Sequence, residues 1–190
     1  MRRSYWRCLV SVLFLGAVGG CAVGGGGGGG GNDNVADNDN TADNDNAVDN
    51  DNTAEEAERF SADLSGDNEV EPITSSVTGT ATLEAFTDRI EFNVTVSGDA
   101  NVTINAAHIH LGGADENGPV VAFLTPEDFT IAPAEGLTVA GEITAADLLD
   151  VLLGAPLEDL VQAFRDGGAY VNVHSLGNPG GECRGQIGPD

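Results

Sequence analysis

Three histidines are the residues of this 190-residue chain whose type and spacing best suit metal chemistry. His108 and His110 stand one residue apart in NAAHIHLGG, and His174 follows more than sixty residues later in AYVNVHSLGNPGGECRGQI. Imidazole is the commonest side-chain metal ligand and suits zinc and copper. An H-x-H pair joined by a third histidine makes a three-nitrogen site with an open fourth position. The sequence therefore offers a candidate copper or zinc site.

Strand geometry decides whether these rings can meet. Side chains two apart on a strand point the same way, so His108 and His110 share a face and Ile109 takes the other. In AYVNVHS the same alternation places Val173 toward the core and His174 away from it. If the two strands are neighbours, the three imidazoles converge on one patch. Imidazole nitrogens more than about 5 Å apart would exclude a shared ion, because metal–nitrogen bonds are about 2 Å long.

The same histidines also have a purely structural interpretation, which the sequence leaves open. LGGADENGPVV and SLGNPGGECRG are long turns, and a ring that donates to a carbonyl or a carboxylate would hold such a turn in place. Asp115, Glu116 and Glu182 are the available carboxylates. The sequence contains no nucleophile elbow, P-loop, H-E-x-x-H or dinucleotide fingerprint. We therefore expect no catalytic residues and no enzyme activity.

The elements that must position these rings are predicted to be short strands. From about Phe60 the chain shows runs with period-two alternation, bounded by Gly, Pro, Asn or Asp. In the clearest run, RIEFNVTVSG, the apolar side chains that point one way are Ile90, Phe92, Val94 and Val96. A strand with one wet face is typical of an antiparallel β-sandwich or barrel.

Residues 144–166 interrupt this pattern with helical spacing. Thr144 is a credible N-cap, and Leu148 and Leu152 share a face. After Pro156, apolar residues again recur at helical spacing until DGG ends the segment. We expect a short helical insertion, as a hairpin or a pair of helices, whose leucine face covers one open end of the sheets.

The C-terminal segment combines a turn with a last strand. NPGG reverses the chain, and ECRGQI follows it. Glu182 and Arg184 fall on one face of this strand, so we expect a structural ion pair between them or with His174. Cys183 falls on the inward face, where it is expected to be a small buried apolar residue.

The charge balance excludes nucleic acid as a partner. The chain has 31 acidic residues, seven arginines and no lysine. Three of those arginines precede Cys21, so the chain from Cys21 onward carries a net charge of −27. Such a surface repels phosphate backbones and anionic headgroups and favours cations, although solubility alone would also explain it.

The first twenty residues read as a signal peptide that brings the protein out of the cytoplasm. A basic start is followed by the apolar CLVSVLFLGAV and by VGGC, which ends at Cys21. VGGC resembles the lipobox of bacterial lipoproteins, which implies removal of residues 1–20 and a lipid on Cys21. We expect a lipid anchor in the cell envelope, facing the periplasm or the exterior. Ala22, in place of aspartate, favours the outer membrane. An ordinary secreted protein is the alternative.

Residues 21–56 are predicted to be a disordered tether. Eight consecutive glycines at 24–31 precede a near-repeat of Asp-Asn, which has too little apolar content to offset the entropy of ordering. Mutual repulsion of the aspartates extends this segment. It lacks the glycine and terminal glutamate of an EF-hand loop, so no specific calcium site is expected.

From residue 57 to 190 the chain resembles the CHRD domain, a family named from chordin and present in many bacterial exported proteins. The matching pieces run in order through residues 60–188: FSADLSGDNEVEP, TGTATLEA, AAHIHLGGADENGPVVAFL, GEITAADL and AYVNVHSLGNPGGECRGQI. The last is the most specific and resembles the family pattern YVNVHT–NPGGEIRGQ, with Ser175 and Cys183 as departures. Residues that fit this pattern, and for which we expect structural roles, are Asn172, Asn178, Pro179, Gly180, Gly181, Glu182, Arg184 and Gln186.

The resemblance implies an all-β domain outside the cytoplasm but no settled activity. The H-x-H strand also resembles, more loosely, the copper-site strand of Cu,Zn superoxide dismutases, which are β-sandwiches too. The fuller set of dismutase ligands is missing, so no dismutase activity is expected.

Two functions remain open at this point. The first is a lipid-anchored, non-catalytic module that binds a protein or glycan partner through loops such as 112–119 and 175–181. The alternative is a copper- or zinc-binding module that uses His108, His110 and His174. The sequence predicts no particular oligomeric state.

Overall fold

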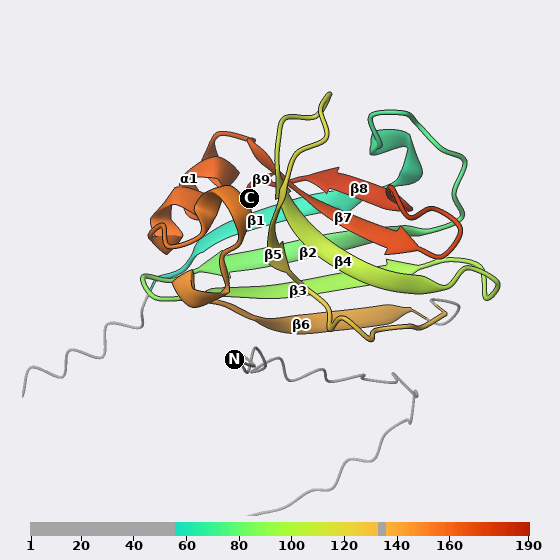
Figure 1. Cartoon of the computed structure of the whole chain (residues 1–190), viewed down its shortest axis with the longest axis horizontal. Helices are drawn as coiled ribbons and strands as arrows, with labels where there is room; N and C mark the ends of the chain where they lie inside the picture. Colours follow the sequence, from blue (N-terminus) through green and yellow to red (C-terminus); the bar gives the residue numbers. More distant parts are fainter. Residues whose placement is uncertain (1–55, 133–135) are drawn as a thin grey trace, which may run out of the picture. The chain divides into compact units, whose positions relative to one another are not determined.

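The computed structural model describes residues 56–132 and 136–190, whose strands form two antiparallel sheets (Figure 1). The five-stranded sheet has the order β6-β3-β2-β1-β9 and the four-stranded sheet has the order β5-β4-β7-β8. The first comprises β1 (Glu58–Leu64), β2 (Thr78–Ala85), β3 (Ile90–Ser97), β6 (Leu137–Ile143) and β9 (Gly188–Pro189). The second comprises β4 (Ile104–Leu111), β5 (Val120–Phe123), β7 (Ala169–Ser175) and β8 (Cys183–Gln186).

This arrangement confirms the predicted all-β antiparallel sandwich, and within the described ranges the sheets do not close into a barrel. The predicted signal peptide (1–20), the lipidation residue Cys21 and the predicted tether (21–56), apart from Glu56, lie outside the described residues. None of the helices in the described ranges is long and apolar enough to cross a membrane.

The core lies between the two sheets and follows from the alternation of the strands. The four apolar side chains predicted to share a face of β3 are all buried: Ile90, Phe92, Val94 and Val96. In the other sheet, Ile109 of β4 and Val171 of β7 pair with each other and are fully buried. Inward apolar residues of both sheets thus fill one core, as expected for a sandwich.

The segment between β6 and β7 is less helical than predicted. It forms two 3-10 turns, η2 (Ala145–Asp147) and η3 (Asp150–Leu152), before the helix α1 (Leu157–Arg165). Thr144 begins the segment as expected, in a capping box with Asp147. The predicted first helix does not form, because the backbone N–H of Leu149 donates to Val121 O of β5 and Asp150 adopts a φ of 50°. Both features are incompatible with a continuous helix.

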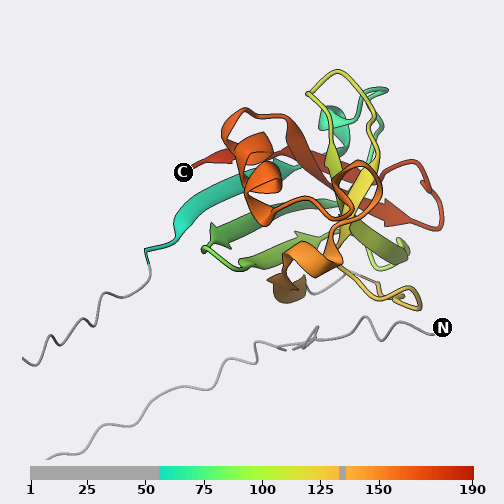
Figure 2. The ribbon, with the colours of Figure 1, turned by 60° about the vertical axis from the view of Figure 1, so that its left-hand side comes forward.

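Helix α1 covers one end of the two sheets, as expected (Figures 1 and 2). Its buried face consists of Leu157, Leu160, Val161 and Phe164. The Phe164 ring packs edge-on against Phe60 of β1, with ring centroids 5.3 Å apart. Apolar packing, rather than a partner groove, therefore occupies this face of the helix.

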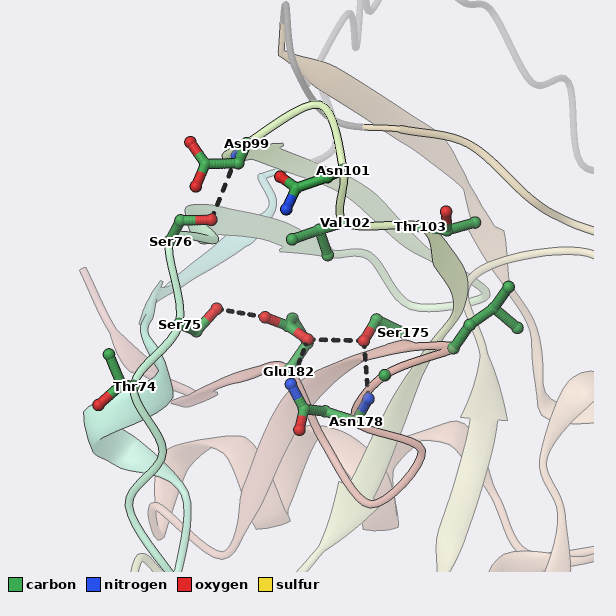
Figure 3. Close-up of a pocket in the computed structure, with 12 residues that line it drawn as sticks. Thr74, Ser75, Ser76, Asp99, Asn101, Val102, Thr103, Ser175, Asn178 and Glu182 are labelled. Carbon is green, nitrogen blue, oxygen red and sulfur yellow. Dashed lines mark hydrogen bonds between the residues drawn. The ribbon is translucent and has the colours of Figure 1, made fainter.

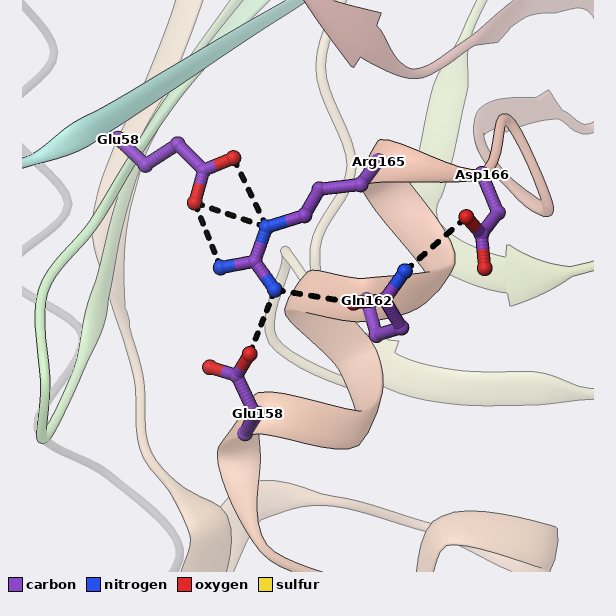
Figure 4. A network of polar contacts seen from close by, with 5 residues as sticks. All are labelled: Glu58, Glu158, Gln162, Arg165 and Asp166. Atoms are coloured by element: carbon purple, nitrogen blue, oxygen red, sulfur yellow. Dashed lines mark hydrogen bonds and ion pairs between the residues drawn. The ribbon is translucent and has the colours of Figure 1, made fainter.

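Arg165 joins the end of α1 to the first strand (Figure 4). Its guanidinium donates to both carboxylate oxygens of Glu58 and, on the helix itself, to Glu158 and Gln162. The hydrogen bonds from Arg165 hold the pKa of Glu58 below its usual value. Because these groups are partly exposed, the network fixes the position of α1 more than it stabilises the fold.

Two connecting segments cover the outer face of the four-stranded sheet. Figure 1 shows the segment between β4 and β5 and the segment between β1 and β2 on the same side of the molecule, beside β7 and β8. As a result, β7 is buried along almost its whole length, including Tyr170 and Asn172 on its outer face. The predicted histidine patch lies on this covered face.

Candidate metal centre

The three histidines converge, as the alternation predicted. β4 and β7 are antiparallel neighbours, and His174 pairs with Ala106 across them, while Asn172 pairs with His108 and Tyr170 with His110. One ring nitrogen from each of the three histidines lies within 4.8 Å of the other two. This spacing is inside the limit of about 5 Å for a shared ion. To bind a single ion, each nitrogen would have to move about 1 Å toward the common centre.

Two of the rings are oriented by backbone carbonyls. Nδ1 of His110 lies 2.9 Å from Gly118 O, and Nδ1 of His174 lies 3.0 Å from Pro179 O. A carbonyl can only accept, so each Nδ1 carries the proton and each Nε2 keeps a lone pair. The structural interpretation is therefore also confirmed, since both rings hold a loop. Their partners are carbonyls and not the carboxylates considered from the sequence.

Three of the other ring nitrogens are buried without a hydrogen-bond partner among the described residues. Among the described residues, no partner exists for His108 Nδ1, His110 Nε2 or His174 Nε2, and all three atoms are inaccessible to solvent. Burial lowers the pKa of all three histidines, and that of His108 falls to about 4 with the help of His174 and His110. The rings are thus neutral at pH 7, which is the form that binds metal.

His110 is held further by a stack of side chains on the same face. Its ring lies parallel to Tyr170, with centroids 4.9 Å apart and an interplanar angle of 12°. Arg184 places its guanidinium carbon 3.4 Å from the centroid of the Tyr170 ring. The Tyr170 hydroxyl accepts a hydrogen bond from Gly118 N, the residue whose carbonyl orients His110. Outer contacts of this kind fix the orientation of a metal-binding ring.

Arg184 is 1 % exposed and organises the loop between β4 and β5. Its Nη2 donates to Gly113 O at 2.6 Å and its Nη1 donates to Glu116 O at 3.0 Å. The ion pair expected between Arg184 and Glu182 or His174 is therefore wrong. Glu182 precedes the start of β8, so strand alternation does not apply to it, and its carboxylate turns away from Arg184.

Glu182 instead binds three side chains from two loops (Figure 3). Ser75, Ser175 and Asn178 all donate to its carboxylate. Burial alone would raise the pKa of Glu182, but the three hydrogen bonds outweigh it and lower the pKa. Glu182 therefore joins the 175–181 turn, which carries the His174 partner Pro179, to the segment before β2.

The same residues border a cleft of about 460 Å³ beside this turn (Figure 3). Its lining is rich in hydroxyl and amide groups, and its apolar side chains are those of Val102 and Leu176. The lining residues are Thr74, Ser75, Ser76, Asp99, Asn101, Val102, Thr103, Ser175, Leu176, Gly177, Asn178 and Glu182. This cleft coincides with one of the two loops considered for partner binding.

The other motif residues have structural roles. Gln186 donates to three carbonyls, those of Gly112, Gly167 and Ala169. Cys183 is a free, fully buried thiol, and burial raises its pKa to about 12, so the expectation of an inert apolar residue is confirmed. Gly180 has open space around it, whereas a side chain at Gly181 would overlap the Glu69 carboxylate.

The alternation in AYVNVHS places Tyr170 and Asn172 on the face of His174, and the pairing of Tyr170 with His110 confirms it. Sequence reasoning did not identify Glu69 as a neighbour of this face. No local pattern distinguishes Glu69 from the other acidic residues, because only the fold of the β1–β2 connection brings it to Asn172. The bulge that shifts the register between β4 and β5 at Ile109 and His110 was not predicted either.

Comparison with known proteins identifies one family. Residues 60–187 match the family model of the CHRD domain, which covers nearly all of the folded part and includes all three histidines. A search of the curated proteins found no match to the chain.

Proposed function

Because this chain belongs to the CHRD domain family, whose name specifies no activity, we propose its function from the geometry of its own site: it is a non-catalytic metal-binding module. A single observation supports this most directly. Each of the three histidines offers a ring nitrogen within 4.8 Å of the other two, and His108 Nδ1, His110 Nε2 and His174 Nε2 are buried without a hydrogen-bond partner among the described residues. Leaving buried acceptors unpaired is costly, and one cation would satisfy all three lone pairs.

Copper is the preferred ion and zinc the alternative. The candidate group consists of three neutral nitrogens, a donor set that suits both metals. Along the first-row series, affinity for nitrogen sites peaks at Cu(II). The chain's net charge of −24 also raises the local concentration of cations.

The test is a titration of the purified chain with Cu(II) and with Zn(II), compared with the double variant His108→Ala/His174→Ala. We expect one ion per chain at the histidine site, with affinity reduced at least a hundredfold in the double variant. Asn93→Ala, on the outer face of the other sheet, is the matched control and should bind like wild type. Equal binding by wild type and the double variant would show that the histidines have a structural role only.

The location of this module is part of the proposal. Residues 1–20 direct export, Cys21 carries a lipid, and residues 21–56 hold the domain away from the cell envelope. The supporting observations are the VGGC sequence and the glycine and Asp-Asn repeats. Metabolic labelling with a fatty acid should mark the wild-type chain and leave Cys21→Ser unlabelled. Labelling of both chains would contradict the lipid anchor.

A second function, recognition of a protein or glycan partner, is favoured by the cleft beside residues 175–178. Its lining of hydroxyl, amide and carboxylate groups suits the hydroxyls of a sugar. Asn101 and Thr103 lie on its wall opposite Glu182 (Figure 3). If this cleft binds glycans, Asn101→Ala/Thr103→Ala should abolish binding to a glycan array without altering metal uptake. Absence of any glycan signal for wild type would count against this function.

A further inference from the structure

Two buried oxygen atoms, one in a residue paired with His108 and one in the neighbour of that residue, also lack a hydrogen-bond partner among the described residues. They are Asn172 Oδ1 and Glu69 Oε1, in side chains of residues that are 2 % and 9 % exposed. Asn172 pairs with His108 across β7 and β4, and it lies two residues from His174 on the same face. Directly paired residues have Cβ atoms about 5 Å apart. The Asn172 side chain therefore adjoins the metal centre.

The orientation of the Asn172 amide follows from its contact with Glu69. The Nδ2 group lies 3.4 Å from Glu69 Oε2. A carboxylate can only accept, so the NH₂ group faces Glu69 and the carbonyl arm points elsewhere. On its other side the Glu69 carboxylate abuts Gly181, where a Cβ would overlap Oε1. The pair is thus packed in place, with one acceptor on each residue still free.

With the proton of His108 on Nε2, all of these atoms are acceptors. Three are imidazole nitrogens and two are the side-chain oxygens of Asn172 and Glu69; a third unpartnered oxygen among the described residues, Asn105 Oδ1, belongs to neither group. A cation would take the three nitrogen lone pairs but would leave both oxygens unpaired. A water molecule bound to that cation would donate an O–H group to Asn172 Oδ1, the oxygen that adjoins His108. One ion and one water together would satisfy the three nitrogens and the Asn172 oxygen.

We infer that the fourth position of the metal faces Asn172 and Glu69 and holds water in preference to an anion. This inference rests on the proposed metal-binding function. A small anion such as azide has no proton to donate, so it would face the Asn172 acceptor and the nearby Glu69 carboxylate. Arg184 of β8 pairs with Asn172 of β7. Its guanidinium donates to the carbonyls of Gly113 and Glu116. Its guanidinium is engaged by the loop and not by a ligand at the metal.

The experiment is an azide titration of the chain loaded with Cu(II), followed by the azide-to-copper charge-transfer absorption. Asn172→Leu removes the acceptor with little change in volume and should bind azide about five- to tenfold more tightly, because water loses a hydrogen bond. Asn172→Asp adds a negative charge and should bind azide about tenfold more weakly. Asn93→Leu, on an exposed strand position of the other sheet, should leave azide affinity unchanged.

Glu69→Gln keeps the shape of the side chain and removes its charge. It should shift azide affinity in the same direction as Asn172→Leu, so the inference stays testable if the leucine variant does not fold. Azide affinities equal to wild type in all the Asn172 and Glu69 variants would overturn the inference while leaving the metal site intact. Cu(II) uptake no better than that of His108→Ala/His174→Ala would overturn the metal function and this inference with it.

Discussion

In His110 and His174 the two ring nitrogens have different environments. In each ring, Nδ1 donates to a loop carbonyl, and Nε2 is buried without a partner among the described residues. A structural tie and a metal ligand are therefore compatible in the same residue, although the sequence presents them as alternatives. The tie even supports ligation, because it fixes the tautomer with a free Nε2 lone pair.

Burial of these rings predicts a pH dependence of stability for the metal-free chain. Their pKa values are lowered from 6.5, that of His108 to about 4, so the unfolded chain binds more protons below pH 6.5. Stability is fully present above pH 6.5 and is lost as the pH falls toward 4. We expect urea denaturation to show a loss of about 2 kcal/mol between pH 7 and pH 5. The double variant His108→Ala/His174→Ala should lose less, and an equal loss would contradict the prediction.

Arg184 and Arg89 offer a matched comparison of one substitution in two environments. Both guanidiniums lie over an aromatic ring, at 3.4 Å from Tyr170 and 3.9 Å from Phe86, but Arg184 is fully buried. Lysine lacks the planar fork that reaches several loop carbonyls at once. Arg184→Lys should therefore cost about 3 kcal/mol of stability and speed amide exchange in residues 112–119. Arg89→Lys should cost under about 1 kcal/mol, and similar costs would refute this account.

At the scale of elements, local patterns predicted the strands well. The alternation in β3 is confirmed residue by residue, and the shared face of His108 and His110 follows from the same rule. The insertion after Thr144 was predicted less well, because a tertiary bond from Leu149 to Val121 replaces a helical one. The bulge at Ile109 and His110 depends in the same way on the neighbouring strand β5.

The NPGG turn provides a test of how closely the β1–β2 connection is packed on β8. Gly181 has a φ of +152°, and a Cβ there would overlap the Glu69 carboxylate, whereas Gly180 has open space. Gly181→Ala should destabilise the fold by about 2–4 kcal/mol and displace Glu69 from Asn172. Gly180→Ala is the control and should change stability by less than about 1 kcal/mol in thermal unfolding. Equal effects of the two substitutions would show that Glu69 does not pack against Gly181.

At the scale of the whole domain, the burial of the outer face of the four-stranded sheet could not be predicted from the sequence. Alternation placed Tyr170, Asn172 and Arg184 on the side away from the core, which in most sandwiches is wet. Here two loops bury that side, so the same residues become a second, polar interior. Such burial depends on contacts between distant segments, and no local pattern reports it.

The acidity of the whole chain predicts how metal affinity responds to salt. A net charge of −24 attracts cations over a range set by the Debye length, which shrinks from about 30 Å at 0.01 M to about 3 Å at 1 M salt. We expect Zn(II) affinity to fall about tenfold across this range of sodium nitrate, measured by competition with a chelating dye. Ag(I) carries half the charge, so the change in the logarithm of its affinity should be half as large. If salt changes the two affinities equally, or changes neither, the prediction is wrong. The acidic surface then contributes to solubility and not to metal affinity.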